Sequence, residues 1–265
     1  MTEVIPVSVE WLTLREQADA RSRSRRLGAA AARLTSAPAV VHDLGSGTGS
    51  MMRWLAPLLA EPQTWVFHDW NPVLLEHAAG LTSVHTGVRM SVTDVAHLSA
   101  GDLAGASLVT VSALLDVLSR EELETVVGAC VGARVPALFT LSVTGRVELD
   151  PLDAGDGVFA AAFDDHQRRT TDGRRMLGPD AVSRAIELFR AAGWPIRTAH
   201  SPWRLDATDR MLVAEWLDGW LAAAVEERPA LREWAEEYAR SRTAQLEAGA
   251  LRVIVHHIDF LAWPP

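Results

Sequence analysis

Between residues 39 and 200, short apolar runs alternate with segments in which apolar residues recur every three or four positions. The first pattern is typical of buried strands and the second of helices that bury one face. Strands that alternate with helices form a parallel sheet through right-handed crossovers, with helices on both faces. The pattern predicts strands over residues 39–44, 64–68, 88–92, 107–111, 137–143 and 195–200. It predicts helices over residues 51–60, 72–79, 120–132 and 180–193.

The segments on either side of this pattern are helical. Residues 9–34 carry apolar side chains at helical spacing, and Ser36-Ala37-Pro38 ends that pattern. Residues 206–247 predict two or three helices rich in tryptophan, before a last strand over residues 251–260. Residues 144–178 show only weak periodicity. We therefore expect an N-terminal helical segment (residues 1–35), an α/β core (residues 36–205 and 248–265) and a helical insertion (residues 206–247).

The clearest motif is a glycine-rich turn between the first strand and the next helix, Asp43-Leu44-Gly45-Ser46-Gly47-Thr48-Gly49-Ser50. Glycines let a ligand approach the backbone closely, and the N–H groups at a helix start favour a polar or anionic group. A dinucleotide fingerprint requires glycine at position 50, where this chain has Ser50. The sequence lacks Gly-Lys-Ser/Thr, which excludes a nucleoside triphosphate loop. Asp43 precedes the turn, and capping of the following helix is an alternative role for it.

This turn resembles the first motif of the class I S-adenosylmethionine-dependent methyltransferases, an acidic residue followed by x-Gly-x-Gly-x-Gly. The resemblance covers residues 39–143. It implies a Rossmann-like, doubly wound, mostly parallel α/β sheet of seven strands with an antiparallel last strand. It also implies a cofactor site in which Gly45, Gly47 and Gly49 cradle the methionine and ribose of S-adenosylmethionine. Ser46 lies within that turn, and Asp43 lies near the amino end of the cofactor.

Later landmarks of that family have counterparts in this chain. Asp69 ends the second strand, where the family holds the ribose with a carboxylate that accepts from two hydroxyls at once. Trp70 follows, where the family has an apolar residue against adenine, and plain core packing is the alternative. Asp94 follows the third strand, where an acidic residue accepts from the adenine amine, and an ordinary loop aspartate is the alternative. Ser112 lies on the fourth-strand motif, which runs beside the transferred methyl group.

Candidate catalytic residues follow the fourth and fifth strands. Methyl transfer from a sulfonium needs in-line approach, and a base is required only if the acceptor holds its proton tightly. Asp116 is the first candidate, because it lies at the sheet edge where open α/β folds bind ligands; helix capping is the alternative. His166 and Arg168 form a second group, although a solvated helix face has the same composition. In an active site, Arg168 favours a substrate with a carboxylate or phosphate.

Composition narrows the range of partners. The 265 residues carry a formal charge of −9, which disfavours nucleic acid as a partner. All 25 basic residues are arginine, which excludes lysine chemistry. Cys130 is the only cysteine and the nine histidines lack metal-site spacing, so we expect neither an intrachain disulfide nor a metal. The first residues do not resemble a signal peptide and no apolar run is long enough to span a membrane, so we expect a cytoplasmic protein.

The tryptophan-rich helices admit two interpretations. Trp203, Trp216, Trp220 and Trp234 form either a lid over an acceptor pocket, together with the N-terminal helix, or packing contacts within the chain or across a homodimer. The family resemblance implies an S-adenosylmethionine-dependent methyltransferase that acts on a small metabolite, an anionic one if Arg168 contacts it. An RNA or protein methyltransferase and a catalytically inactive S-adenosylmethionine-binding protein are the alternatives. Ser50 disfavours a nicotinamide-dependent oxidoreductase.

Overall fold

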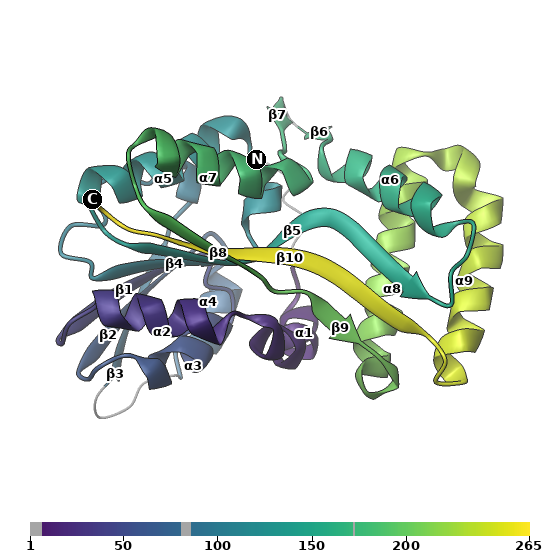
Figure 1. Ribbon diagram of the computed structural model, residues 1–265, viewed down its shortest axis with the longest axis horizontal. Coiled ribbons are helices and arrows are strands. Elements are labelled where there is room, and N and C mark those ends of the chain that lie inside the picture. The colour runs from purple at the N-terminus through teal and green to yellow at the C-terminus, as the bar shows by residue number, and fades with distance from the viewer. Residues whose placement is uncertain (1–6, 81–85, 172) are drawn as a thin grey trace.

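The computed structural model describes residues 7–80, 86–171 and 173–265. One twisted sheet runs through the molecule (Figure 1). Its strands are β1 (Ala39–Leu44), β2 (Gln63–Asp69), β3 (Thr86–Val92), β4 (Leu108–Ser112), β5 (Ala137–Asp150), β8 (Ile196–His200), β9 (Trp203–Leu205) and β10 (Arg252–Ala262). The strand order is β3-β2-β1-β4-β5-β10-β8, and β9 also pairs with β10. Strands β1 to β5 pair in parallel and β10 is antiparallel to its neighbours, so the predicted Rossmann-like fold is confirmed.

Helices cover both faces of this sheet. They are α1 (Val9–Ser22), α2 (Arg25–Leu34), α3 (Ser50–Leu55), α4 (Pro72–Ala78), α5 (Arg120–Ala133), α6 (Asp156–Gln167), α7 (Ala181–Ala191), α8 (Arg210–Glu227) and α9 (Arg232–Glu247). A small hairpin of β6 (Thr170–Thr171) and β7 (Arg174–Arg175) follows α6. Helices α2, α3 and α4 bury apolar side chains against one face, and α5 and α7 against the other. Within the described residues, no helix is both long and apolar enough to cross a membrane.

The helical pattern over residues 9–34 contains two helices rather than one. The backbone of Arg23 leaves the helical conformation (φ −52°, ψ 136°), and α2 starts anew after it. Ser24 caps α2, because its hydroxyl accepts from the N–H of Leu27 at 3.3 Å. The apolar spacing continues across this junction, so periodicity alone does not reveal the break.

Strand β5 continues seven residues past the predicted end of the fifth strand, and α6 follows in the segment of weak periodicity. The antiparallel partner β10 runs along β5 from residue 137 to residue 150, with two irregularities in register. The extended pair projects beyond the rest of the sheet, β9 adds a third strand along β10, and α6, α8 and α9 pack beside it (Figure 1).

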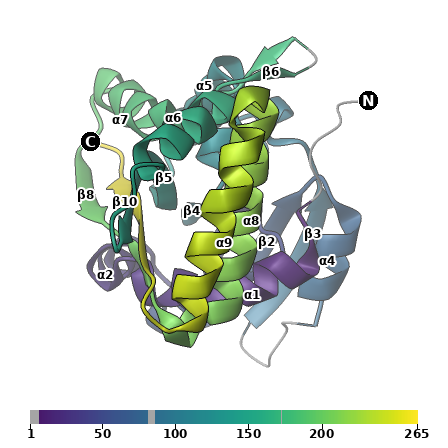
Figure 2. The same cartoon turned by 90° about the vertical axis from the view of Figure 1, so that its right-hand side faces the viewer.

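The long helices α8 and α9 lie side by side (Figure 2). They share a buried cluster with α6 that includes Phe159, Trp220 and Tyr238. The guanidinium of Arg242 in α9 also forms an ion pair with Asp156 in α6. Trp234 packs on Phe159 with its ring centroid 5.4 Å away, and 38% of its surface stays exposed. A homodimer contact through this region stays a prediction.

Asp259 ties the helix junction to the sheet. Its Oδ2 accepts from the N–H of Ser24 at 2.7 Å, and its Oδ1 accepts from the N–H of Leu141 at 2.8 Å and from the hydroxyl of Ser201 at 2.5 Å. Asp259 is fully buried, and burial raises the pKa of its carboxyl. Leu141 has φ +55°, so this carboxylate stabilises an unfavourable stretch of β5 backbone.

We expect Asp259→Ala to lower the free energy of unfolding by about 2–4 kcal/mol, because two backbone N–H groups lose their acceptor in a buried place. Urea unfolding at neutral pH measures the change. Asp218→Ala removes an exposed carboxylate from α8 and is the matched control, with an expected change within about 0.5 kcal/mol. Equal stability of the two variants would contradict the anchoring role of Asp259.

Candidate functional site

The glycine-rich turn joins β1 to α3 at the carboxyl edge of the parallel strands. Gly45, Gly47 and Gly49 have φ values of +65°, +52° and +81°, which side chains with a Cβ atom rarely adopt. The N–H groups of Gly45 and Ser46 donate to the carbonyl of His68 at 2.8 and 3.1 Å, so the turn rests on the end of β2. A Cβ atom at Gly47 would lie 3.0 Å from a methyl group of Leu12 in α1. The turn is therefore a close-approach surface that α1 covers.

Asp69 lies beside this turn, at the end of β2. Its Oδ2 accepts from the N–H of Gly47 at 2.8 Å, and its Oδ1 accepts from the N–H of Asn71 at 2.9 Å. Burial raises the pKa of Asp69, whereas the backbone N–H groups of Asn71 and Gly47 lower it. Each carboxylate oxygen can accept a second hydrogen bond. Asp69 thus both holds the turn and can accept from a ligand.

Asp43 is buried beneath the turn and has one unsatisfied oxygen. Its Oδ1 accepts from the hydroxyl of Thr110 at 2.7 Å. Its Oδ2 has no hydrogen-bond partner in the part of the chain that the structure describes. Burial raises the pKa of Asp43 to about 7, although Thr110 and Arg23 both act to lower it. A ligand cation beside Oδ2 would stabilise the ionised carboxylate.

Arg23, at the junction of α1 and α2, is a residue of this site that the sequence interpretation missed. Its Nη2 donates to the hydroxyls of Ser50 and Ser112, each at 3.0 Å. Asp19 Oδ2 lies 4.0 Å from the same nitrogen. The guanidinium is buried, and its Nε–H has no partner among the residues described. An arginine at the junction of two helices carries no local motif, so only the folded chain reveals its place.

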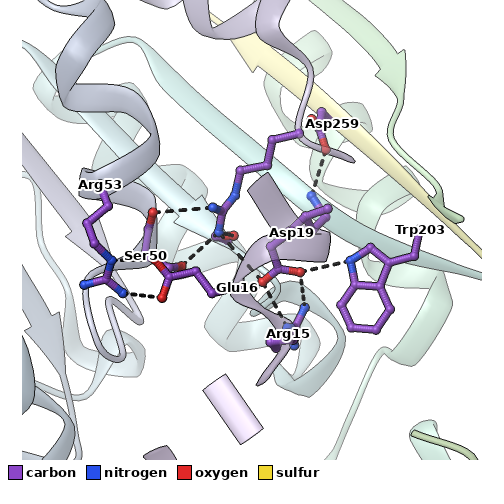
Figure 3. A network of polar contacts seen from close by, with 10 residues as sticks. Arg15, Glu16, Asp19, Ser50, Arg53, Trp203 and Asp259 are labelled. Atoms are coloured by element: carbon purple, nitrogen blue, oxygen red, sulfur yellow. Dashed lines mark hydrogen bonds and ion pairs between the residues drawn. The ribbon is translucent and has the colours of Figure 1, made fainter. Parts of the chain in front are cut away.

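Charged side chains connect α1 to the turn (Figure 3). Arg53 of α3 donates to Glu16 of α1 at 2.6 Å and to the carbonyl of Thr48 at 2.7 Å. Arg15 of α1 holds Asp19 with two hydrogen bonds of 3.0 and 3.2 Å. Because these contacts join α1 to the glycine-rich turn and Arg23 to Ser50, α1 forms a fixed wall over the carboxyl edge of the sheet.

The other predicted cofactor residues occupy different positions around this edge. Ser112 ends β4 and accepts from Arg23, beside the turn. Trp70 follows Asp69 and is 47% exposed, so its ring surface is open to a ligand. Asp94 is mostly exposed and caps a short 3-10 helix by accepting from the N–H of Ala96 at 2.9 Å. The structure thus brings Asp43, Asp69 and Ser112 together around the turn and leaves Asp94 further out, past the end of β3.

Asp116 lies beside a pocket of about 200 Å³. Its Oδ2 accepts from the side-chain amide of Gln167 at 3.1 Å, and burial raises the pKa of its carboxyl. The residue follows β4 in a 3-10 turn, so the pocket adjoins the carboxyl edge that carries the glycine-rich turn. The geometry therefore supplies an ionisable group next to a cavity at the edge where α/β folds bind ligands.

His166 and Arg168, on the same segment as Gln167, lie away from this pocket. His166 is buried between Arg169 at 3.0 Å and Glu226 at 3.3 Å. Arg168 donates to both carboxylate oxygens of Asp180, at 2.7 and 2.9 Å, and lines a separate surface hollow of about 510 Å³. The structure does not bring either residue together with Asp116. Across the described ranges, no three His, Cys, Asp or Glu side chains gather in a way that could hold a metal ion.

Comparison with known proteins finds a likeness in structure and none in sequence. No family model and no curated protein sequence matches this chain. A cyclopropane synthase from Mycobacterium tuberculosis superposes with a TM-score of 0.51 and 12% identity over 99% of this chain and 87% of its own. A methyltransferase from Thiobacillus denitrificans in complex with S-adenosyl-L-homocysteine gives a TM-score of 0.44 and 16% identity over 98% and 100%. At these identities the likeness shows a shared Rossmann-like fold.

We expect Asp43→Asn to stabilise the ligand-free protein at pH 8 by about 2–4 kcal/mol. An aspartate in the unfolded chain loses its proton near pH 4, whereas Asp43 in the folded protein loses it near pH 7. The folded protein therefore holds the proton more tightly than the unfolded chain does. The protonated Asp43 carboxyl stabilises the folded state at low pH, and this stabilisation is lost as the pH rises through 7. The asparagine carries no charge at any pH and can still accept from Thr110.

Urea unfolding of both proteins between pH 5 and pH 8 measures this difference, which should shrink toward pH 5. Asp218→Asn on the surface of α8 is the control and should run parallel to the unsubstituted protein. A constant offset between Asp43→Asn and the unsubstituted protein would show that Asp43 ionises normally.

Proposed function

We propose that this protein is an S-adenosylmethionine-dependent methyltransferase that acts on a small molecule. The observation that carries the proposal is a pair of unsatisfied, oppositely charged groups buried at the glycine-rich turn. Asp43 Oδ2 lacks a donor and Arg23 Nε–H lacks an acceptor in the described part of the chain. The methionine end of the cofactor carries one ammonium and one carboxylate, so it would satisfy both groups.

The remaining cofactor contacts follow from the same edge of the sheet. Gly45, Gly47 and Gly49 provide the close-approach surface for the methionine and ribose. Asp69, next to Gly47, is placed to accept from the ribose hydroxyls. Trp70 offers an exposed ring for the adenine, and Asp94 a carboxylate for its amine. When bound, the cofactor supplies an electrophilic methyl group to the region where β4 ends.

Asp116 would then act on the acceptor. Its carboxyl lies in the pocket beside β4, and Gln167 fixes its orientation. Burial raises the pKa of Asp116, which makes its carboxylate a better proton acceptor than an exposed aspartate. The pocket would hold the acceptor for in-line approach. His166 and Arg168 would contact only an acceptor long enough to extend from this pocket to their side of α6.

The size of the pocket favours a small molecule over the macromolecular alternatives. A volume of about 200 Å³ holds one small ring with substituents. The chain charge of −9 disfavours RNA. A catalytically inactive binding protein remains the alternative that requires a turnover experiment.

A thermal-shift panel tests cofactor class. S-adenosylhomocysteine should raise the melting temperature and NAD should not, because Ser50 replaces the glycine that the dinucleotide fingerprint requires. Stabilisation by NAD alone would overturn the proposal. Release of S-adenosylhomocysteine from S-adenosylmethionine in a metabolite extract then separates an enzyme from an inactive binder.

Asp69→Ala should weaken S-adenosylhomocysteine binding by about 1–3 kcal/mol, through lost hydrogen bonds to the ribose and a loosened Gly47. Asp69→Asn keeps one acceptor oxygen, so its affinity for S-adenosylhomocysteine should lie between those of the unsubstituted protein and Asp69→Ala. Isothermal titration calorimetry measures both, with Glu76→Ala on the exposed face of α4 as the control. Unchanged affinity of Asp69→Ala would place the ribose elsewhere.

Asp116→Asn should lower turnover by about 10²–10⁴-fold while cofactor affinity stays the same, since the amide keeps the shape but accepts no proton. Single-turnover assays and calorimetry on the same preparation separate the two quantities. Full activity of this variant would remove Asp116 from the catalytic role.

A further inference from the structure

The pocket beside Asp116 has aromatic walls. It lies between α1, α6, α8 and the strands β5 and β10, and it is lined by Trp11, Phe163, Trp203, Trp216 and Trp220. Trp216 and Trp220 stack with centroids 5.3 Å apart, and Trp11 packs on Trp203 at 6.5 Å. Its volume is about 200 Å³. A cavity of about 150 Å³ is large enough for benzene, so this pocket matches one substituted aromatic ring.

The polar atoms of these lining residues are incompletely paired. Asp164, Gln167 and His257 also line the pocket. As judged over the described residues, Asp164 Oδ1 and Gln167 Oε1 are buried acceptors without a donor and Trp220 Nε1–H is a buried donor without an acceptor. His257 Nδ1 is buried and unpaired as well, and its tautomer decides whether it donates or accepts. Each unpaired buried group costs about 1–3 kcal/mol, which a ligand recovers by pairing it. Two of these four atoms, the oxygens of Asp164 and Gln167, can only accept while the carboxyl is ionised. A matching ligand therefore donates hydrogen bonds to these two oxygens.

The charges around the pocket disfavour an anion. The guanidinium of Arg15 lies 4.8 Å from the ring centroid of Trp203, but its charge is already matched by two hydrogen bonds to Asp19. Arg146, which also lines the pocket, forms an ion pair with Glu148 at 2.6 Å. Two carboxyl groups, of Asp116 and Asp164, remain. Burial raises the pKa of Asp164 to about 6, so this group is mostly ionised at neutral pH. Arg168, which favoured an anionic substrate on sequence grounds, lines the other hollow.

We propose that this pocket binds the methyl acceptor, and that the acceptor is an uncharged planar aromatic compound with hydroxyl or amino hydrogens on its ring. The indole walls recognise the ring, while the oxygens of Asp164 and Gln167 accept from its protic groups. A lone pair of the acceptor's hydroxyl oxygen or amino nitrogen forms a bond to the methyl carbon, and the carbon–sulfur bond breaks with its electron pair going to sulfur. The acceptor proton passes to Asp116 and then to solvent. This assignment rests on the proposed methyltransferase function.

Direct binding to the whole protein, with and without saturating S-adenosylhomocysteine, tests the assignment. Five probes separate the features of the ligand: catechol, ortho-phenylenediamine, 1,2-dimethoxybenzene, cyclohexane-1,2-diol and benzoate. Catechol and ortho-phenylenediamine carry both ring and donors, and their comparison distinguishes hydroxyl from amino acceptors. The other three lack donors, lack the ring, or carry a negative charge. Calorimetry gives the affinities, and quenching of tryptophan fluorescence reports occupancy of the pocket.

At least one of catechol and ortho-phenylenediamine should bind on the order of tenfold tighter than each of the other three probes. Trp216→Leu and Asp164→Asn should each weaken this preferred probe by on the order of tenfold. Trp263→Leu removes a half-buried indole outside the pocket, and Asp165→Asn removes the neighbouring exposed carboxylate of α6, which pairs with Arg228. Both controls should bind as the unsubstituted protein does.

The preference among probes is measured on the unsubstituted protein, so it does not depend on whether a variant folds. Equal or stronger binding of benzoate or cyclohexane-1,2-diol would overturn the ring-and-donor assignment. Equal loss in Asp164→Asn and Asp165→Asn would show that Asp164 is not the acceptor group. Absence of S-adenosylhomocysteine binding would instead overturn the proposed function, independently of how the aromatic probes behave.

Discussion

Arg23 carries a full positive charge inside the protein, and such a group is tolerated only where hydrogen bonds and opposite charges surround it. Ser50, Ser112 and Asp19 provide these partners. They come from α3, β4 and α1, so the guanidinium holds the N-terminal helices against the carboxyl edge of the sheet. Asp259 secures the other side of the same junction through Ser24. The cover over the glycine-rich turn and one wall of the pocket beside Asp116 depend on α1 being held at this position.

The charged groups at this edge also show how stability and binding compete. Asp43 and Arg23 each keep one buried polar atom unpaired in the described part of the chain, which costs free energy in the ligand-free protein. A ligand end with an ammonium and a carboxylate would pair both atoms and remove that cost. Part of the binding free energy then comes from hydrogen bonds that the ligand-free protein does not make. The same burial without a donor on Oδ2 disfavours the ionised carboxylate of Asp43 and raises its pKa.

Helix α1 belongs to both halves of the candidate active site. Leu12 covers Gly47 of the turn, while Trp11 and Arg15 lie in the wall of the aromatic pocket. The extended pair β5 and β10 supplies the floor of that pocket, and α8 supplies Trp216 and Trp220. Under the proposed function, α1 and α8 therefore complete an acceptor pocket whose other lining residues come from the core, while the ends of β1 and β2 hold the cofactor.

The sequence by itself determined the order of strands and helices in the core, the glycine-rich turn and the carboxylates Asp43, Asp69 and Asp116 near the ends of their strands. These features are local, since apolar periodicity and glycine spacing act over a few residues. Only the tertiary structure decided that the N-terminal helix breaks at Arg23, that Arg23 lies beside Ser112, and that Trp11 and Trp203 share one wall with Arg15. It also separated Arg168 from Asp116. Contacts between residues 89 and 184 positions apart depend on how whole elements pack, and no short stretch of sequence contains that information.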